Sequence, residues 1–205
     1  MGAVKLTKND LKKQKDMLRQ FQRYLPTLQL KKQQLQTVIM KTAAEAEALR
    51  DRLLKMVEGL NGWIAVFAEN KTFADGKRIE DLVVPDKVVC GEENIAGTIV
   101  PVFRELTFRE AEYDAADYPL WVDEAIKHIR NISAGTAMIK TLENQLELLN
   151  GELRLTSQRV NLFEKVRIPE AKENIRKIEI YLGDQQTSAV VRGKIAKKKR
   201  LGAVV

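Results

Sequence analysis

The sequence predicts a mainly α-helical protein: a long antiparallel two-helix coiled coil with a small central β-hairpin element. Two stretches of the chain place apolar residues at heptad spacing over many turns. Only 5 prolines and 11 glycines occur among the 205 residues, which leaves little chain for loops. Between the two stretches, β-branched residues alternate with turn residues. This length suits one ordinary domain, or one compact domain with a long appendage.

The first arm carries an apolar seam from Leu11 to Phe67. Fourteen of the seventeen positions reached by alternating steps of three and four residues are apolar. A stripe kept over so many heptads is typical of a coiled-coil seam and narrower than the apolar face of a globular helix. Thr7 and Asp10 form an approximate capping box, so we expect this helix to begin near residue 8.

Two residues of the first arm depart from this pattern. Lys32 falls on the seam, where it could set the register as a polar residue, or could lay its stem along the apolar surface with its ammonium group in water. We favour the second interpretation. Pro26 lacks a backbone N–H and crowds the carbonyl four residues earlier, so it predicts a kink.

The second arm repeats the seam from Tyr118 to Phe163, with eleven of fourteen positions apolar. Beyond Pro169 the stripe resumes in a shifted frame, as expected if this proline interrupts the helix, kinks it and resets its phase. The shifted positions are Ala171, Ile175, Ile178 and Leu182.

The central segment from Leu82 to Phe108 predicts a β-hairpin or two short strands, with the turn near residues 91–94. Pro101 is best placed on an edge strand, because proline cannot donate to a sheet ladder. With Asp75-Gly76 as a turn signal, we expect three segments: residues 1–74 as the first long helix, 75–115 as the central hairpin and short-helix region, and 116–205 as the second long helix with a basic tail.

A register for the two arms follows if Pro26 and Pro169 lie level. Facing residues should then have numbers that add to about 195, which pairs Leu49 with Leu146 and Gly135 with Leu60. A shift by seven residues in either direction matches the two seams equally well, so only the prolines select this register.

The residues that could carry catalysis are few. The sequence contains no glycine-rich phosphate loop, dinucleotide fingerprint, zinc-protease motif or nucleophile elbow. The single cysteine, Cys90, excludes a disulfide framework and is predicted to be a small core residue of a valine-rich strand. The single histidine, His128, falls on the seam as a packing residue. We interpret the acidic pairs as solvated surface, and expect no catalytic residue, cofactor or metal; the pairs are Glu92 with Glu93 and Asp114 with Asp117.

Charge is distributed unevenly along the chain. Residues 1–44 hold ten basic and two acidic side chains, residues 192–200 hold six basic and no acidic ones, and residues 75–124 hold thirteen acidic and five basic ones. The basic ends could bind nucleic acid or acidic lipid, enter an acidic or polar protein cavity, or be solvated helix faces. Stacking aromatics do not alternate with these basic residues, which argues against nucleic acid. No stretch is long and apolar enough to predict a membrane span or a signal core.

Particular motifs give the sequence a family resemblance. The stretch Arg159 to Pro169, RVNLFEKVRIP, fits an R-V-N-x-x-E-x-x-x-I-P pattern, and YLPTLQLKKQQL at residues 24–35 is similar to bacterial branches of the same family. The opening Leu6-Thr7-Lys8-Asn9, the central β-type insert and the lysine-rich end complete the likeness. On these grounds the chain resembles the D subunit, the central rotor shaft of V-type/A-type ATPases and ATP synthases.

The resemblance implies a non-catalytic central-stalk component that couples ATP hydrolysis or synthesis to proton or sodium translocation. The implied partners are the A and B ring subunits, the F subunit and the C (or d) subunit that links to the membrane rotor ring, with no nucleic acid and no cofactor. The implied location is cytoplasmic, peripheral to the membrane. The candidate shaft and ring contacts are Arg159, Asn161, Glu164, Pro169, Lys197 and Lys198. The alternatives are a basic coiled-coil adaptor for nucleic acid or acidic membranes, and a helical-hairpin scaffold without a ring partner.

Overall fold

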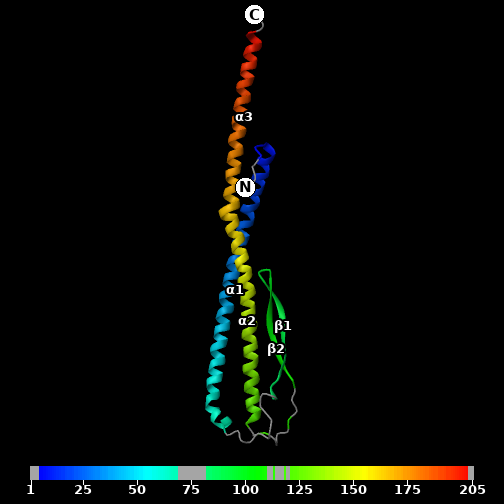
Figure 1. Ribbon diagram of the computed structural model, residues 1–205, viewed down its shortest axis with the longest axis vertical. Helices are drawn as coiled ribbons and strands as arrows, with labels where there is room; N and C mark the ends of the chain where they lie inside the picture. The colour runs from blue at the N-terminus through cyan, green and yellow to red at the C-terminus, as the bar shows by residue number, and fades with distance from the viewer. Residues whose placement is uncertain (1–4, 69–81, 110–112, 114–117, 119–120, 203–205) are drawn as a thin grey trace. The chain divides into compact units, whose positions relative to one another are not determined.

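The computed structural model describes residues 5–68, 82–109, 113, 118 and 121–202. The helices are α1 (Lys8–Ala68), α2 (Val122–Leu162) and α3 (Ile168–Gly202), with a π-helical turn, η3 (Phe163–Arg167), joining the last two. Strands β1 (Pro85–Ile95) and β2 (Thr98–Phe108) form one antiparallel hairpin (Figure 1). The predicted fold class, mainly helical with a small central hairpin, is confirmed.

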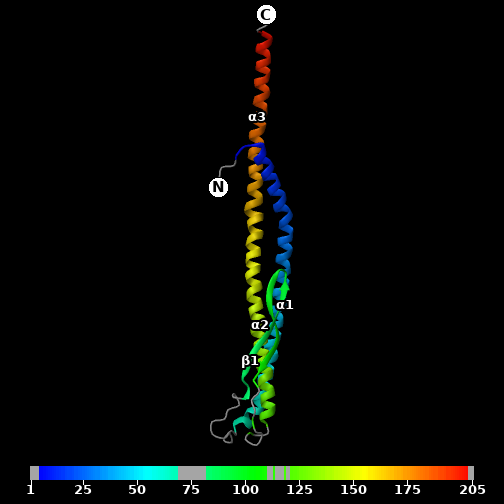
Figure 2. The same cartoon turned by 90° about the vertical axis from the view of Figure 1, so that its right-hand side faces the viewer.

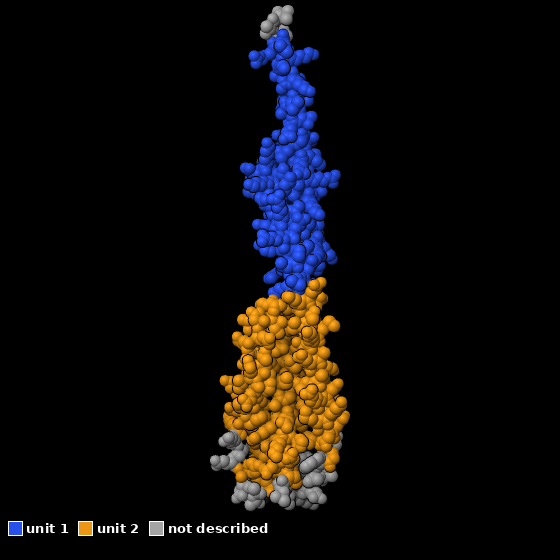
Figure 3. Space-filling model, turned by 180° about the vertical axis from the view of Figure 1, so that it is seen from behind, with its two compact units in different colours: residues 1–32, 155–205 blue, residues 33–154 orange. Residues whose placement is uncertain are grey.

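The chain divides into two compact units (Figure 3). The terminal unit comprises residues 1–32 and 155–205, and the central unit comprises residues 33–154. The boundaries of the three predicted segments, 74/75 and 115/116, lie outside the described residues, as does the Asp75-Gly76 turn. That three-part division therefore remains a prediction.

Helix α1 begins at Lys8, as the capping residues predict. The hydroxyl of Thr7 donates to Asp10 Oδ2 over 2.6 Å and accepts from the Asp10 backbone N–H over 3.2 Å. The Thr7 side chain thus satisfies one of the backbone donors that a helix N-terminus leaves free, and the Asp10 carboxylate is favourable near the positive end of the helix dipole.

The predicted seam of α1 is confirmed by burial as far as Leu53, whereas its next position, Met56, is exposed. Every seam position from Leu11 to Leu53 is buried or half-buried, whereas most of the positions between them are exposed. Leu35, Ala46 and Leu53 are fully buried, and Lys32 is half-buried. The seam positions Trp63 and Phe67 lie among the residues whose side chains are not described.

Within the central unit, α2 buries two faces. Its seam residues Ala125, Leu142 and Leu149 are buried, as predicted. A second buried row follows the hairpin, which runs alongside α2 in both views (Figures 1 and 2); its buried members are Val122, Ile126, Thr141 and Gln145. The helix therefore packs against both α1 and the hairpin.

Two small apolar clusters hold these elements together. The first joins Val122 and Ile126 of α2 to Leu82 and Val83, which precede β1. The second joins Leu35 of α1, Leu149 of α2 and Val100 of β2, all three inaccessible to solvent. Full burial of side chains of this size contributes about 1.5–3 kcal/mol each, so these few residues fix the hairpin to the helices.

The hairpin turn lies at Ala96-Gly97, and the predicted turn near residues 91–94 is wrong. Ile95 pairs with Thr98, and both turn residues have positive φ, 51° for Ala96 and 81° for Gly97. A two-residue turn with this backbone matches the right-handed twist of the flanking strands. Gly91 lies inside β1 opposite Val102. Pro101 of β2 pairs with Glu92, and in a two-stranded sheet each strand is an edge strand, as predicted for this proline.

Cys90 is exposed, so its predicted role as a core residue is wrong. Strand β1 is exposed along nearly its whole length, whereas β2 supplies the buried residues Val100 and Leu106. The valine-rich composition of β1 predicts burial, but only the neighbouring strand places side chains in the core.

The predicted register is also wrong, by one heptad. Gly135 of α2 lies against Leu53 of α1, not against Leu60: a methyl group on Gly135 would stand 2.6 Å from Leu53 Cδ2. An apolar seam that repeats every seven residues fits its partner again after a shift of seven, so the seam residues do not select a register alone. The assumption that the two prolines lie level selected the wrong alternative.

Candidate functional site

The four motif residues predicted as shaft contacts lie on one stretch of the terminal unit. Arg159 and Asn161 end α2, Glu164 lies in the π turn, and Pro169 is the second residue of α3. All four are exposed, whereas Val160 between the first two is buried. The motif thus combines one core residue with exposed side chains on either side of it, because residues two apart lie about 200° apart around an α-helix.

This stretch packs against the N-terminal part of α1 through two side chains. The ring of Phe163 stacks on that of Phe21, with 5.2 Å between centroids. Beside it, the amide of Gln29 donates a hydrogen bond to the Glu164 carboxylate. Glu164 is therefore the one candidate whose contact with α1 is described, and sequence reasoning did not anticipate Gln29 or Phe21 as its neighbours.

The phase of the seam changes within the π turn, one turn before the position expected from Pro169. The backbone N–H of Ile168 donates to the carbonyl of Phe163, five residues earlier, in place of the usual four. Before the turn Thr156 and Val160 are buried, and after it Ala171 and Ile178 are buried. The predicted shifted frame is confirmed, but its cause is the wider turn.

The predicted kinks stay predictions. Pro26 lies inside α1, whose helical assignment continues through it from Lys8 to Ala68. The hydroxyl of the next residue, Thr27, donates to the carbonyl of Tyr24 over 2.7 Å.

Exposed ion pairs connect the helices in each unit. In the terminal unit Lys15 Nζ lies 2.6 Å from Glu179 Oε1, and both side chains are about half exposed, so the pair is worth at most about 1 kcal/mol. In the central unit Arg50 binds Glu143 across the helices and Glu47 within α1. These hydrogen bonds, that of Glu143 first, raise the pKa of Arg50 above its usual value.

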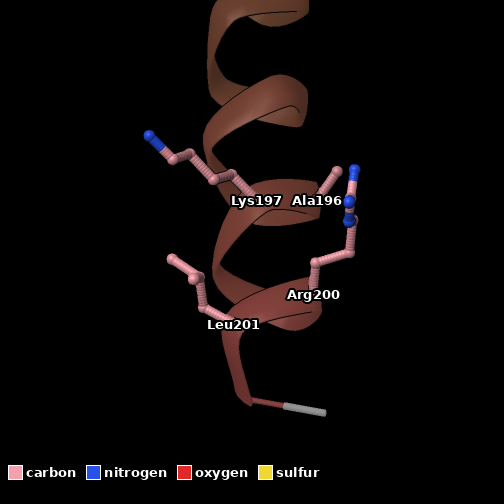
Figure 4. A pocket seen from close by; sticks show the side chains of 4 residues that line it. All are labelled: Ala196, Lys197, Arg200 and Leu201. Carbon is pink, nitrogen blue, oxygen red and sulfur yellow. The ribbon is translucent and has the colours of Figure 1, made fainter. Parts of the chain in front are cut away.

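The end of α3 is a second candidate surface. Every residue from 183 to 201 is exposed, including Lys197 and Lys198. The side chains of Lys197 and Arg200 project from different sides of the helix (Figure 4). Large apolar side chains lie exposed among these basic ones: Val190, Val191, Ile195 and Leu201. These apolar residues make the end of α3 a candidate interaction surface.

The described residues offer little for metal or acid–base chemistry. Among them, no group of three or more His, Cys, Asp and Glu side chains is placed to hold a metal ion. His128 Nε2 lies 3.7 Å from Glu124 Oε1 on the surface of α2, where its side chain is 41% exposed. No helix within the described ranges has the length and apolar character to cross a membrane.

These features define a class of protein in which long helices pair through their faces. One exposed helix end, that of α3, carries both charged and apolar side chains. The comparisons with known proteins agree with that class. Residues 10–198 match the family described as the ATP synthase D subunit. The chain belongs to this ATP synthase D-subunit family.

Individual relatives cover nearly the whole chain. A V-type ATP synthase D subunit of Borreliella burgdorferi is 48% identical over 197 residues, which are 96% of this chain and 95% of the relative. Proteins of the same description from Chlamydia muridarum and Chlamydia pneumoniae are 36% and 34% identical, over 97% and 96% of this chain and 96% and 92% of their own lengths. The family confirms the central-stalk function predicted from the sequence and gives no support to the adaptor alternative.

Sequence reasoning missed the hairpin-facing row of α2. Gln145, only 7% exposed, donates a hydrogen bond to the Pro101 carbonyl of β2. Its neighbours at steps of four are Ala137 and Thr141, with Ser133 before them. Small and polar residues at that spacing give no apolar signal, but four of them in one row on a helix that already has an apolar seam would have indicated a second packed face.

Proposed function

We propose that this chain is the non-catalytic rotor shaft of its ATP synthase, turning within a ring of A and B subunits and coupling ATP hydrolysis or synthesis there to ion translocation. The observation that carries the proposal is the end of α3. Residues 184–201, the last part of α3, bear both apolar and basic side chains on their exposed surface. A helix of this kind gains most of its stability from packing, so a partner that surrounds it would supply what the chain itself does not.

The composition of this end supports a fit inside a protein cavity. Val190, Val191 and Ile195 would be buried by such a cavity, while the six basic residues from 192 to 200 would face acidic or polar groups on its wall. Because these side chains differ around the helix, each ring subunit would contact a different face of the helix at each rotation angle of the shaft. The rotation angle would then favour one conformation of each ring subunit over another. By the same linkage, a change in conformation of a ring subunit would favour a new rotation angle.

The other proposed contacts are divided between two sets of partners. The structure exposes four motif residues of the terminal unit, and we assign these to the ring together with Lys197 and Lys198: Arg159, Asn161, Glu164 and Pro169. The acidic central region is assigned to the F subunit and to the C (or d) subunit that joins the membrane ring. Outside the acidic region but within the central unit, the exposed apolar residues Leu54 and Val57 of α1 support a partner contact in that unit. The assembled chain would lie on the cytoplasmic side, peripheral to the membrane, and itself bind no nucleotide.

The test is a truncation that removes residues 193–205 from the full complex. We expect the ring to assemble, with slower ATP turnover and fewer ions pumped per ATP. The matched control replaces Lys172 and Lys177, two exposed lysines of α3 that precede the removed residues, by alanine and should leave coupling unchanged. Wild-type pumping per ATP by the truncated complex would show that this end is only a solvated helix terminus.

The non-catalytic assignment has its own test. The highly purified chain should hydrolyse no ATP, whereas the complex should. Hydrolysis that persists in the isolated chain through further purification would contradict the assignment.

A further inference from the structure

The π turn of the terminal unit contains one residue more than the seam needs. Thr156 and Ala171 are both buried, and they are separated by fifteen residues, two heptads and one further residue. Each residue advances an α-helix by about 100°, so an uncompensated extra residue would rotate Ala171 and Ile178 away from the seam. The wide turn from Phe163 to Arg167 absorbs that residue, and both side chains stay buried.

The facing segment of α1 has no matching insertion. Its seam runs from Leu11 through Leu18 and Leu25 in regular steps of three and four, and each of these positions is half-buried. The two helices are in contact at the start of the turn, where Phe163 stacks on Phe21, and again beyond it, where Glu179 pairs with Lys15. The extra residue therefore belongs to one helix of the pair only.

The turn is also where this helix is weakest. None of its five residues is buried. Pro169 follows two residues later and has no N–H, and in a regular helix its ring would crowd the carbonyl of Lys165. Phe163 and Glu164 of the turn do contact α1. A segment with no buried residue and with missing backbone hydrogen bonds nevertheless opens at a lower free energy than its neighbours.

We propose that the π turn and Pro169 form a compliant joint, the point at which the helix pair of the terminal unit bends or twists first while the seams on either side stay closed. The seam does not need the joint. Without one residue of the turn, Val160 and Phe163 would be followed by the present Ile168, Ala171 and Ile175 at unbroken heptad spacing. The mechanical meaning of the joint, yielding under torque, rests on the proposed function; its existence in the chain does not.

The experiment compares the full-length chain with a straightened variant that lacks Val166 and carries Pro169→Ala. In the wild type we expect backbone amides of residues 160–172 to exchange with solvent faster than those of residues 149–159. In the straightened variant that exchange should slow about ten-fold or more, and the melting temperature should rise, because regular hydrogen bonds replace the wide turn. Pro169→Ala alone needs no deletion and should slow exchange by a smaller factor.

The matched control deletes Arg23, an exposed residue of the facing helix that has no spare position in its seam. This deletion should lower the melting temperature, because it rotates the preceding seam residues out of the interface. Uniform exchange across residues 149–172 in the wild type would overturn the proposal, as would a straightened variant that melts as low as the control. These readouts come from the chain alone, so their failure is separate from a failure of the truncation test on the complex.

Discussion

Gly135 of α2 and Leu53 of α1 lie in direct contact across the seam of the central unit. A methyl group on Gly135 would stand 2.6 Å from Leu53 Cδ2, 3.1 Å from Cδ1 and 3.2 Å from Cγ. Because the end of the buried Leu53 side chain occupies this position, a methyl group on Gly135 would require Leu53 to move within a packed interface. The glycine therefore allows the two helices to approach and fixes which residues face each other.

Gly135→Ala should destabilise the chain. Alanine favours the helix by about 1 kcal/mol over glycine, but crowding against Leu53 in a packed interior typically costs about 1–3 kcal/mol. We expect a net loss of about 1 kcal/mol in the free energy of unfolding, measured by chemical denaturation. Gly151→Ala, whose methyl group would meet nothing within 4 Å, is the control and should stabilise the chain. Equal gains from both substitutions would contradict the contact.

The register can be tested by cross-linking. With Cys90 replaced by Ser, the pair Leu53→Cys and Gly135→Cys should oxidise to an intramolecular disulfide, since the two positions are in contact. The pair Leu60→Cys and Gly135→Cys should remain reduced, because one heptad corresponds to about 10 Å along the helix. Mobility on non-reducing gels and a count of free thiols distinguish the two results. Bridging of the Leu60 pair alone would restore the register expected from the prolines.

The attachment of the hairpin depends on Gln145. Gln145→Ala removes the donor to the Pro101 carbonyl and leaves a buried position empty, which should cost about 1–3 kcal/mol in unfolding free energy. Hydrogen exchange in β2 should accelerate in the same variant. Asn144→Ala, a change at an exposed neighbour, is the control and should leave both quantities unchanged. If the control and Gln145→Ala behave alike, the hairpin is attached through its apolar residues alone.

Tyr113 should titrate above its ordinary range. Its hydroxyl donates to the Asp123 carboxylate, and this hydrogen bond is the main reason that the pKa of Tyr113 is raised above 10.0. A folded-state pKa above the unfolded value means that the contribution to stability is present below pH 10 and is lost as pH rises through the folded pKa. Ultraviolet titration of the phenol, with Tyr113→Phe identifying its signal, measures the midpoint. Asp123→Asn should bring the midpoint of Tyr113 back towards 10.0, and Glu124→Gln should not. A midpoint that does not change in Asp123→Asn would exclude the hydrogen bond.

The helices and their seams could be predicted because burial in a coiled coil repeats with the sequence. Heptad spacing identified Leu35, Leu53 and Leu149 as core, and Thr7 with Asp10 located the start of α1. The register could not be predicted, since an apolar seam that repeats every seven residues matches its partner equally well after one helix is shifted by seven residues. Only a departure from the repeat, such as Gly135, distinguishes one register from another.

The central hairpin was predicted in outline but not in detail. Glycine is typical of turns, so Gly91 favoured a turn at its position, yet it lies within β1. A Cβ atom there would stand 2.9 Å from Arg104 Nε. The real turn places Ala96 at a positive φ, which alanine seldom adopts, so composition pointed elsewhere. The candidate site divides in the same way: the motif from Arg159 to Pro169 was found from its residues, but its contact with Gln29 depends on which residue of α1 the register places opposite.

The exposed position of Cys90 has a practical consequence. It is the sole thiol of the 205-residue chain, and it stands on the exposed strand of the hairpin. A maleimide dye or a gold particle would therefore attach at one known point of the central unit without any engineered substitution. Because β1 supplies none of the buried side chains of the hairpin, a label there should leave the packing of β2 against α2 undisturbed. The native chain thus provides its own attachment point for following, one molecule at a time, whether this protein turns.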